Sequence, residues 1–152
     1  MSRNREILFR PRQRVAPDFA ISRRVARVEV DQTGYVHFSN YPRYAEEAEY
    51  AFLRSRDLAV IRGESRGILG YPRVSAALEI VHPLACAQTF QVVVESVAHD
   101  AKQLEYVFRL ECAGQPAATI RFRVACCRFP GKGTPYAIPL PESVLTAIFG
   151  SE

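Results

Sequence analysis

The chemistry that this sequence could perform is concentrated in residues 31–42, which read Asp-Gln-Thr-Gly-Tyr-Val-His-Phe-Ser-Asn-Tyr-Pro. Asp31 follows a predicted strand, and Gly34 comes three residues later. Ser39, Asn40 and Pro42 are typical of a helix start. A carboxylate that faces a helix N-terminus can activate water beside backbone N–H groups that hold an oxyanion. The stretch therefore favours acyl transfer to water, unless Asp31 is only a turn residue, a common role of aspartate.

Other catalytic and metal-binding patterns are missing from the sequence. His37, His82 and His99 do not form a metal motif, and no Gly-x-Ser-x-Gly elbow or Ser-His-Asp set occurs at a recognisable spacing. No Cys-x-x-Cys pair occurs, so we expect reduced, partly buried thiols rather than disulfides or metal ligands. The cysteines are Cys86, Cys112, Cys126 and Cys127. We expect neither a metal nor a cofactor.

Length and composition are those of one soluble domain. The chain has 152 residues, of which 48% are hydrophobic and 24% are charged, so it can bury a sizeable core. No apolar run approaches the roughly 20 residues of a membrane span. The first residues lack the apolar segment of a signal peptide. These features predict a cytoplasmic protein without a membrane partner.

Arginine is concentrated near the N-terminus, and the net charge is +4. The arginines of this region are Arg3, Arg5, Arg10, Arg12, Arg14, Arg23, Arg24 and Arg27. A basic arm can bind nucleic acid or an acidic protein. A solvated terminal segment is the simpler interpretation, since lysine occurs only at positions 102 and 132. We therefore expect residues 1–22 to form a basic arm without a nucleic-acid partner, and residues 23–152 to form a single domain.

Apolar spacing predicts one long helix over residues 41–55, with an apolar stripe that packs on a sheet. Glu46 and Glu47 lie on its other side, where we expect a solvated face. Period-two alternation predicts strands over 24–30, 73–81, 89–98, 104–112 and 117–128, with a short edge strand over 7–9. Loops over 63–70 and 129–135 and a helix over 141–149 complete the prediction.

The predicted order is a strand, a helix and then four strands. The connections after residues 98 and 112 are short turns, so the strands that they join are antiparallel neighbours. One helix cannot cover both faces of a five-stranded sheet. We therefore expect the uncovered face or edge to pair with a second subunit, in a homodimer or homotetramer.

These residues and elements resemble the hotdog-fold thioesterases, in particular the hydroxybenzoyl-coenzyme A thioesterase-like branch. The motifs that carry the resemblance are Asp31-Gln-Thr-Gly34, Val36-His37-Phe38, Asn40-Tyr41 and Arg43-Tyr44-x-Glu46-Glu47-Ala48. It extends to His82-Pro83-Leu84 and Ile138-Pro139-Leu140-Pro141 and covers about residues 24–141. The fold that it implies is α+β: a five-stranded antiparallel sheet wrapped around one long central helix.

The resemblance also implies roles for single residues. Asp31 matches the catalytic carboxylate, as general base or as nucleophile, and the backbone N–H of Phe38 would polarise the thioester carbonyl. His37 is a further catalytic candidate that would orient substrate or water. Tyr41 matches a tyrosine of the acyl pocket. The other substrate-binding candidates are Gly34, Asn40, Arg128 and Lys132, of which the last two would meet coenzyme A phosphates as point charges.

The function that follows is hydrolysis of an acyl thioester, carried on coenzyme A or on an acyl-carrier protein. Enediyne-polyketide thioesterases resemble the same segment, but they carry Asn at the Asp31 position and a helix Arg at Glu49, so this chain is nearer to the carboxylate-dependent type. A helix glutamate, Glu46 or Glu47, is the competing catalytic carboxylate. Two other functions stay open: a non-catalytic acyl-binding or regulatory module, and a dehydratase acting on hydroxyacyl thioesters.

Overall fold

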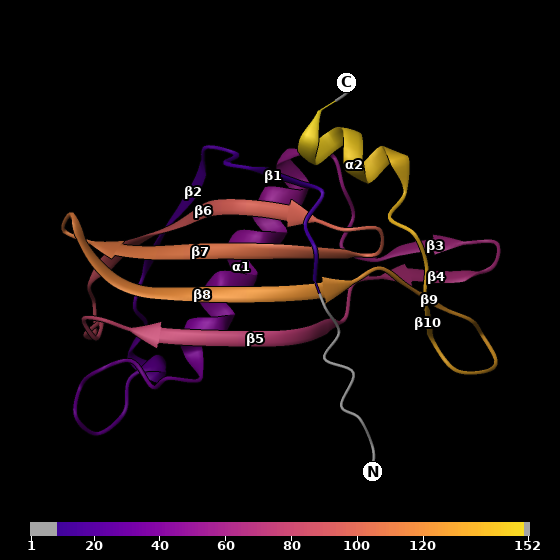
Figure 1. The fold of residues 1–152 in the computed structure, drawn as a ribbon. Coiled ribbons are helices and arrows are strands. Elements are labelled where there is room, and N and C mark those ends of the chain that lie inside the picture. The colour runs from indigo at the N-terminus through magenta and orange to yellow at the C-terminus, as the bar shows by residue number, and fades with distance from the viewer. Residues whose placement is uncertain (1–8, 151–152) are drawn as a thin grey trace, which may run out of the picture.

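A curved antiparallel sheet wraps around one helix in the computed structural model, which describes residues 9–150 (Figure 1). The helix, α1, spans Asn40–Ser55 as expected. Its buried side chains are Tyr41, Tyr44, Ala45, Ala48, Glu49, Phe52 and Leu53. Except for Glu49, these are apolar residues on one stripe, and the two alanines let the sheet approach the helix closely. The α+β class and the central helix are confirmed.

The main sheet has six strands, one more than expected. Its order is β1-β6-β7-β8-β5, and β2 also pairs with β6. The four strands predicted after the helix are confirmed to within a few residues: β5 (Arg73–Ile80), β6 (Thr89–His99), β7 (Gln103–Cys112) and β8 (Gln115–Ala125). Both short turns join antiparallel neighbours. The face toward α1 is aromatic, with the rings of Phe108 and Phe122 in edge contact at 5.5 Å.

The N-terminal part of the sheet differs from the prediction. The expected strand over 24–30 is wrong: β2 is Phe19–Arg24, and Arg27–Glu29 forms a short 3₁₀ helix, η1. The alternation continues past the end of β2, but the Glu29 carboxylate accepts the Ala26 N–H at 2.7 Å and closes a turn instead. A further strand, β1 (Gln13–Val15), pairs with β6. The expected boundary between residues 22 and 23 would therefore cut through β2. Most of the expected strand over 7–9 lies outside the described residues.

A small second sheet replaces the expected loop over 63–70. It contains β3 (Arg62–Glu64), β4 (Gly67–Gly70), β9 (Cys127–Phe129) and β10 (Tyr136–Ala137), in the order β10-β9-β4-β3. Gly67, with φ +122°, makes the turn possible, and a Cβ there would lie 2.3 Å from the carbonyl oxygen of Phe129. Gly67 therefore belongs to a paired strand, although glycines at this spacing had predicted a loop.

The C-terminal helix is confirmed as α2, Glu142–Phe149, which follows Pro141 at its N-cap. Val144 and Ile148 are its buried residues. All four cysteines are free. Among residues 9–150, no helix has the length and apolar character needed to cross a membrane.

One edge of the main sheet is open. β5 pairs with β8 on one side and has no partner strand on the other within residues 9–150. Large apolar side chains are exposed at both ends of this strand, Val74 at one and Ile80 and Val81 at the other. An unprotected edge with exposed apolar residues is a surface suited to pairing with another chain.

Candidate functional site

Asp31 lies in a tight turn. Val30, the residue before it, forms an isolated β-bridge with Val36, and this bridge closes the turn. The Asp31 carbonyl accepts the N–H of Gly34 at 3.1 Å, and its Oδ1 accepts the backbone N–H of Thr33 at 2.8 Å and the Thr33 hydroxyl. Gly34 has φ +84°, a conformation that glycine adopts without strain. Asp31 is therefore a turn residue, as the simpler interpretation had it. The Asp31 carboxylate is exposed, so a ligand can reach it, and the backbone N–H of Tyr35 also contributes to stabilising its charge.

The surroundings of Asp31 keep its carboxyl charged. The Thr33 hydroxyl and then the Thr33 N–H lower the pKa of Asp31 below its ordinary value of 3.8, and His37 contributes in the same direction. Hydrogen bonds to the charged form stabilise that form. Asp31 is consequently a carboxylate at neutral pH, as a nucleophile or base must be.

The start of α1 lies a few residues after this turn. Ser39 is the N-cap residue, but its side chain makes no capping hydrogen bond to the helix. Its hydroxyl instead contacts Nδ1 of His37 at 2.7 Å. The backbone N–H of Phe38 has no acceptor in the part of the chain that the structure describes, so it is available to an external oxygen. The ring of Phe38 is exposed and lies against the His37 ring, with centroids 4.7 Å apart.

The carbonyl oxygen of Glu29 connects the turn to the helix start. It accepts the N–H of His37 and the side-chain amide of Asn40, both at 2.9 Å. Asn40 is therefore occupied in holding the loop within the chain. Tyr41, the residue expected in an acyl pocket, is completely buried, and its hydroxyl accepts the N–H of Leu84 at 3.1 Å. Both residues stabilise the site region in the single chain.

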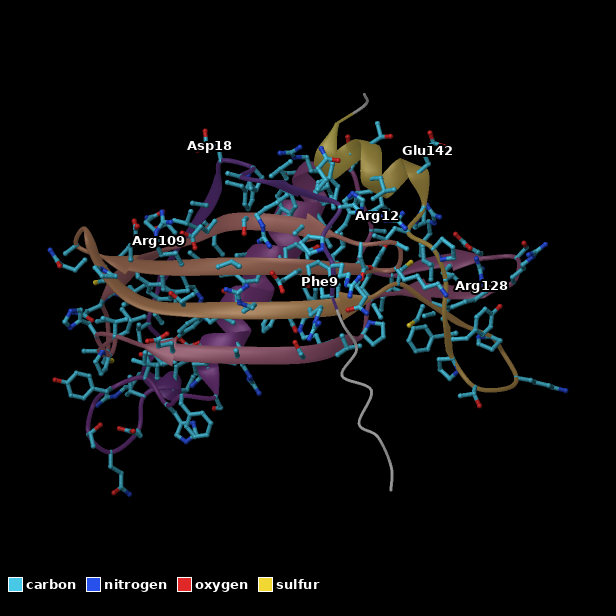
Figure 2. All side chains as sticks on the ribbon, in the orientation of Figure 1. Phe9, Arg12, Asp18, Arg109, Arg128 and Glu142 are labelled. Carbon is cyan, nitrogen blue, oxygen red and sulfur yellow. The ribbon has the colours of Figure 1, made fainter. Side chains whose placement is uncertain are left out.

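The remaining two predicted residues are far from Asp31 within one chain. Figure 2 shows Arg128 beside the small sheet, at the opposite end of the long strands from Arg109. The Asp31 turn belongs to the Arg109 end, because Val25 bonds to Gln88 just before β6 begins. Arg128 is paired with Glu64 at 2.6 Å, and Lys132 is exposed in the following turn. A single chain does not bring these cations to the candidate site.

Three exposed apolar residues lie close to Asp31 in the sequence, and we call them the apolar rim. Val28, which is 93% exposed, belongs to η1, and Tyr35 and Phe38 follow Asp31. All three are large apolar side chains that face solvent. Such a cluster beside a charged turn marks a surface that a ligand or another chain covers.

A second polar site, not predicted as such, lies beneath the other half of α1. Glu49 is only 4% exposed and pairs with Arg73 of β5 at 3.1 Å. Burial raises the pKa of Glu49, and the Arg73 charge opposes this effect. Glu46 bonds to the same guanidinium at 2.9 Å. The spacing of Glu49 from Ala45 and Tyr41 was a signal in the sequence, since residues four apart share a helix face.

Two cavities adjoin this buried pair. The inner one is small and includes Glu49, Arg73 and Tyr106 in its lining. The outer one is an apolar groove of about 410 Å³ between α1 and the small sheet. Its lining contains Tyr50, Val60, Ile61, Ile68, Tyr71 and Phe129. The two share Tyr50, Val60 and Tyr71, so the groove leads toward the ion pair.

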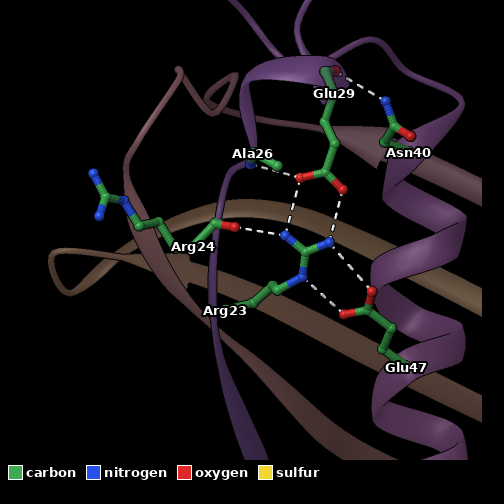
Figure 3. A network of polar contacts seen from close by, with 6 residues as sticks. All are labelled: Arg23, Arg24, Ala26, Glu29, Asn40 and Glu47. Carbon is green, nitrogen blue, oxygen red and sulfur yellow. Dashed lines mark hydrogen bonds and ion pairs between the residues drawn. The ribbon is translucent and has the colours of Figure 1, made fainter.

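Arg23, Glu29 and Glu47 form a third feature that the sequence did not reveal (Figure 3). Arg23 comes from β2 and contacts both carboxylates, at 2.7 Å for Glu29 and 2.9 Å for Glu47. Glu47 is thus exposed but paired, rather than simply solvated. The described residues contain no group of three or more acidic, histidine or cysteine side chains placed to hold a metal ion.

Comparison with known proteins gives consistent matches. The family model described as the thioesterase-like superfamily matches residues 25–148. A curated protein described as a putative esterase, from Aquifex aeolicus, is 39% identical over 74 residues, which are 49% of this chain and 57% of that protein. The chain thus spans less than two thirds of that relative's length.

Solved structures share the fold over most of the chain. A 1,4-dihydroxy-2-naphthoyl-CoA thioesterase from Synechocystis has a TM-score of 0.74 at 24% identity, covering 86% of this chain and 95% of that one. A hypothetical protein from Aquifex aeolicus has a TM-score of 0.76 at 25% identity, covering 86% and 98%. The first likeness, below 25% identity, shows a common fold.

Proposed function

Because the chain belongs to the thioesterase-like superfamily, we propose that it hydrolyses an acyl thioester of coenzyme A or of an acyl-carrier protein, with Asp31 as the reacting carboxylate. The main observation behind this proposal is that one loop contains both Asp31 and Phe38. It combines a carboxylate held in its charged form with an unpaired N–H at a helix start. These are the two groups that acyl transfer to water requires.

The chemistry divides between these groups. The thioester carbonyl oxygen accepts the Phe38 N–H, and the positive end of the α1 dipole stabilises the charge that develops there. Asp31 either removes a proton from water, which attacks the carbonyl carbon, or attacks it directly through Oδ2. In both routes the thiolate leaves and takes up a proton. In the second route water then attacks the acyl carbon of the anhydride formed with Asp31, which releases the acid and restores the carboxylate. His37, in contact with Phe38 and near Asp31, orients the substrate or the water.

The substrate reaches this loop across its apolar rim. Val28, Tyr35 and Phe38 are suited to contact an acyl group or the alkyl part of pantetheine, since exposed apolar clusters lose unfavourable water contact on binding. The turn itself stays polar through Asp31 and Thr33. This contrast supports a ligand with an apolar body and a polar reacting centre.

The site is completed by a second copy of the chain. Two-fold pairing through the open edge of β5 is antiparallel, so the Arg73 end of one strand lies opposite the Ile80 end of the other. The Ile80 end is the end nearest to Asp31, because Val36 bonds to Leu84 after β5. Pairing therefore brings the Arg128 end of one subunit toward the Asp31 loop of the other. This arrangement supports a role of Arg128 and Lys132 as partners of coenzyme A phosphates across the interface.

The acyl group occupies the apolar groove of about 410 Å³ at that same end. Its tyrosine, valine, isoleucine and phenylalanine lining suits an aromatic or aliphatic acyl group. The Glu49–Arg73 pair at the inner cavity can bond to a polar substituent of that group. The proposal therefore favours an acyl group with an apolar body, which can carry a polar substituent at the end that reaches the inner cavity.

The test is release of free thiol from a panel of acyl-coenzyme A and acyl-carrier-protein thioesters, followed with a thiol-reactive dye. We expect hydrolysis of at least one aromatic or aliphatic thioester, and loss of that activity in Asp31→Asn. A panel without thiol release, together with tight binding of acyl thioesters, would contradict the proposal in favour of the acyl-binding module. Loss of water from hydroxyacyl thioesters without thiol release would instead support the dehydratase.

A further inference from the structure

Arg23 forms a clamp between three elements that are separate in the sequence (Figure 3). Its Nη1 and Nη2 donate to the two oxygens of Glu29, at 2.9 and 2.7 Å. Its Nε and Nη2 donate to the two oxygens of Glu47, at 2.9 and 3.2 Å. Contacts of this forked kind fix the orientation of both partners, which a single point charge does not. The clamp thus joins β2, η1 and α1 in one geometry.

The clamp is partly shielded from water. The Arg23 side chain is 25% exposed and the Glu29 side chain 12%, while the Arg23 guanidinium carbon lies 5.0 Å from the centre of the Tyr44 ring. The hydrogen bonds to Glu47 and Glu29 raise the pKa of Arg23, and the Arg23 bond helps to lower the pKa of Glu29 although burial opposes it. The Arg23–Glu29 contact is consequently stronger than a typical surface ion pair.

Glu29 connects the clamp to the candidate site. Its side chain is held by Arg23 and by the Ala26 N–H, and its carbonyl accepts the N–H of His37 and the Asn40 amide. These two donors stand on either side of Phe38 in the sequence. Asp31 follows Glu29 by two residues. One residue therefore anchors the start of the Asp31 turn and the loop that presents the Phe38 N–H.

We infer that Arg23 is a positioning residue for thioester hydrolysis: through Glu29 it holds the Phe38 N–H in a constant place relative to the Asp31 carboxylate. The inference rests on the proposed function. Geometry of this kind matters because an error of about 1 Å between reacting groups costs on the order of 10²-fold in rate. Arg23 itself has no contact with the reacting atoms and acts only through the loop.

A purely structural ion pair makes a different prediction. It would change the stability of the fold, while the folded protein would keep its turnover and the exchange rates of the loop amides. A positioning residue changes the loop in the folded state. The amide of His37 reports this directly, because its acceptor is the Glu29 carbonyl at 2.9 Å.

The experiment compares Arg23→Met with Arg24→Met, an exposed neighbour on the same strand. In Arg23→Met we expect kcat to fall about tenfold with KM nearly unchanged, which is a loss of transition-state positioning. Hydrogen exchange at the His37 amide should become faster, while exchange at the Phe108 amide in β7 stays constant. Arg24→Met should leave all four quantities at the wild-type values. In an Asp31→Asn background, Arg23→Met should add little further loss.

Each other outcome overturns a part of the inference. If exchange at the His37 amide is unchanged in Arg23→Met, Arg23 does not hold the loop through Glu29, whatever the activity. Faster exchange with unchanged kcat overturns the link to hydrolysis. A wild-type chain that hydrolyses no thioester overturns the proposed function. In that case exchange at the His37 amide still shows whether Arg23 holds the loop through Glu29. If Arg23→Met does not fold, Glu47→Gln is the milder variant, and it should change kcat and His37 exchange in the same directions by smaller factors.

Discussion

Asp31 is the residue on which the proposed chemistry depends, and Asp31→Asn tests it with little change in side-chain size. We expect kcat to fall by roughly 10²-fold or more, because the neutral amide is neither base nor nucleophile. Binding of a nonhydrolysable thioester analogue should change little, since the carboxylate acts in the transition state. Steady-state kinetics and calorimetry measure the two effects. Glu95→Gln, a surface change on β6, is the control, and full activity in Asp31→Asn with none in Glu46→Gln would move the catalytic carboxylate to the helix.

The lowered pKa of Asp31 leads to a prediction for pH. The charged form is the active one, so activity is complete above the folded pKa and is lost as the pH falls through it. That pKa is below 3.8 because of the bonds from Thr33. The profile of kcat/KM should therefore stay level down to about pH 5 wherever circular dichroism shows the native fold. An acid limb at a clearly higher pH would instead indicate that a group other than the Asp31 carboxylate controls activity.

At the scale of elements, β1 and β2 make the N-terminal segment part of the sheet. Phe19 of β2 packs with Phe52 of α1, their rings 5.6 Å apart. Deletion of residues 1–20 removes β1 and Phe19, so we expect the free energy of unfolding to fall by about 2 kcal/mol or more. The melting temperature should then drop by roughly 4–8 °C. Deletion of residues 1–8, which keeps both β1 and β2, is the matched comparison. Equal melting of the two deletion variants and the intact chain would restore the interpretation of residues 1–20 as a solvated terminal segment.

At the scale of the whole molecule, the open edge of β5 predicts a dimer with a shared site. Val74→Lys combined with Ile80→Lys places a charge at each end of this edge, a substitution that blocks strand pairing. Light scattering should show a dimer for the wild-type chain and a monomer for the double variant, which should have little activity. Tyr136→Lys, an equally exposed change on β10, should stay dimeric. An active wild-type monomer would contradict the two-subunit site.

Local pattern was sufficient for much of the fold. The helix α1, the strands β5 to β8 and the terminal helix α2 were all predicted to within a few residues, because periodicity and turn chemistry act between near neighbours. The segment 24–30 was predicted wrongly for the same reason. Its alternation is real, but a turn closed by the Glu29 carboxylate competes with the strand and prevails.

In the candidate site, the Asp31 turn and the helix start that follows it could be predicted, since both depend on residues within a few positions of each other. Three further features could be recognised only in the folded chain: the Arg23–Glu47 ion pair, the burial of Glu49 against Arg73, and the place of Arg128 at the far end of the strands. Each of these contacts joins distant parts of the chain. Such partners are selected by the packing of the sheet around α1, which no local spacing encodes.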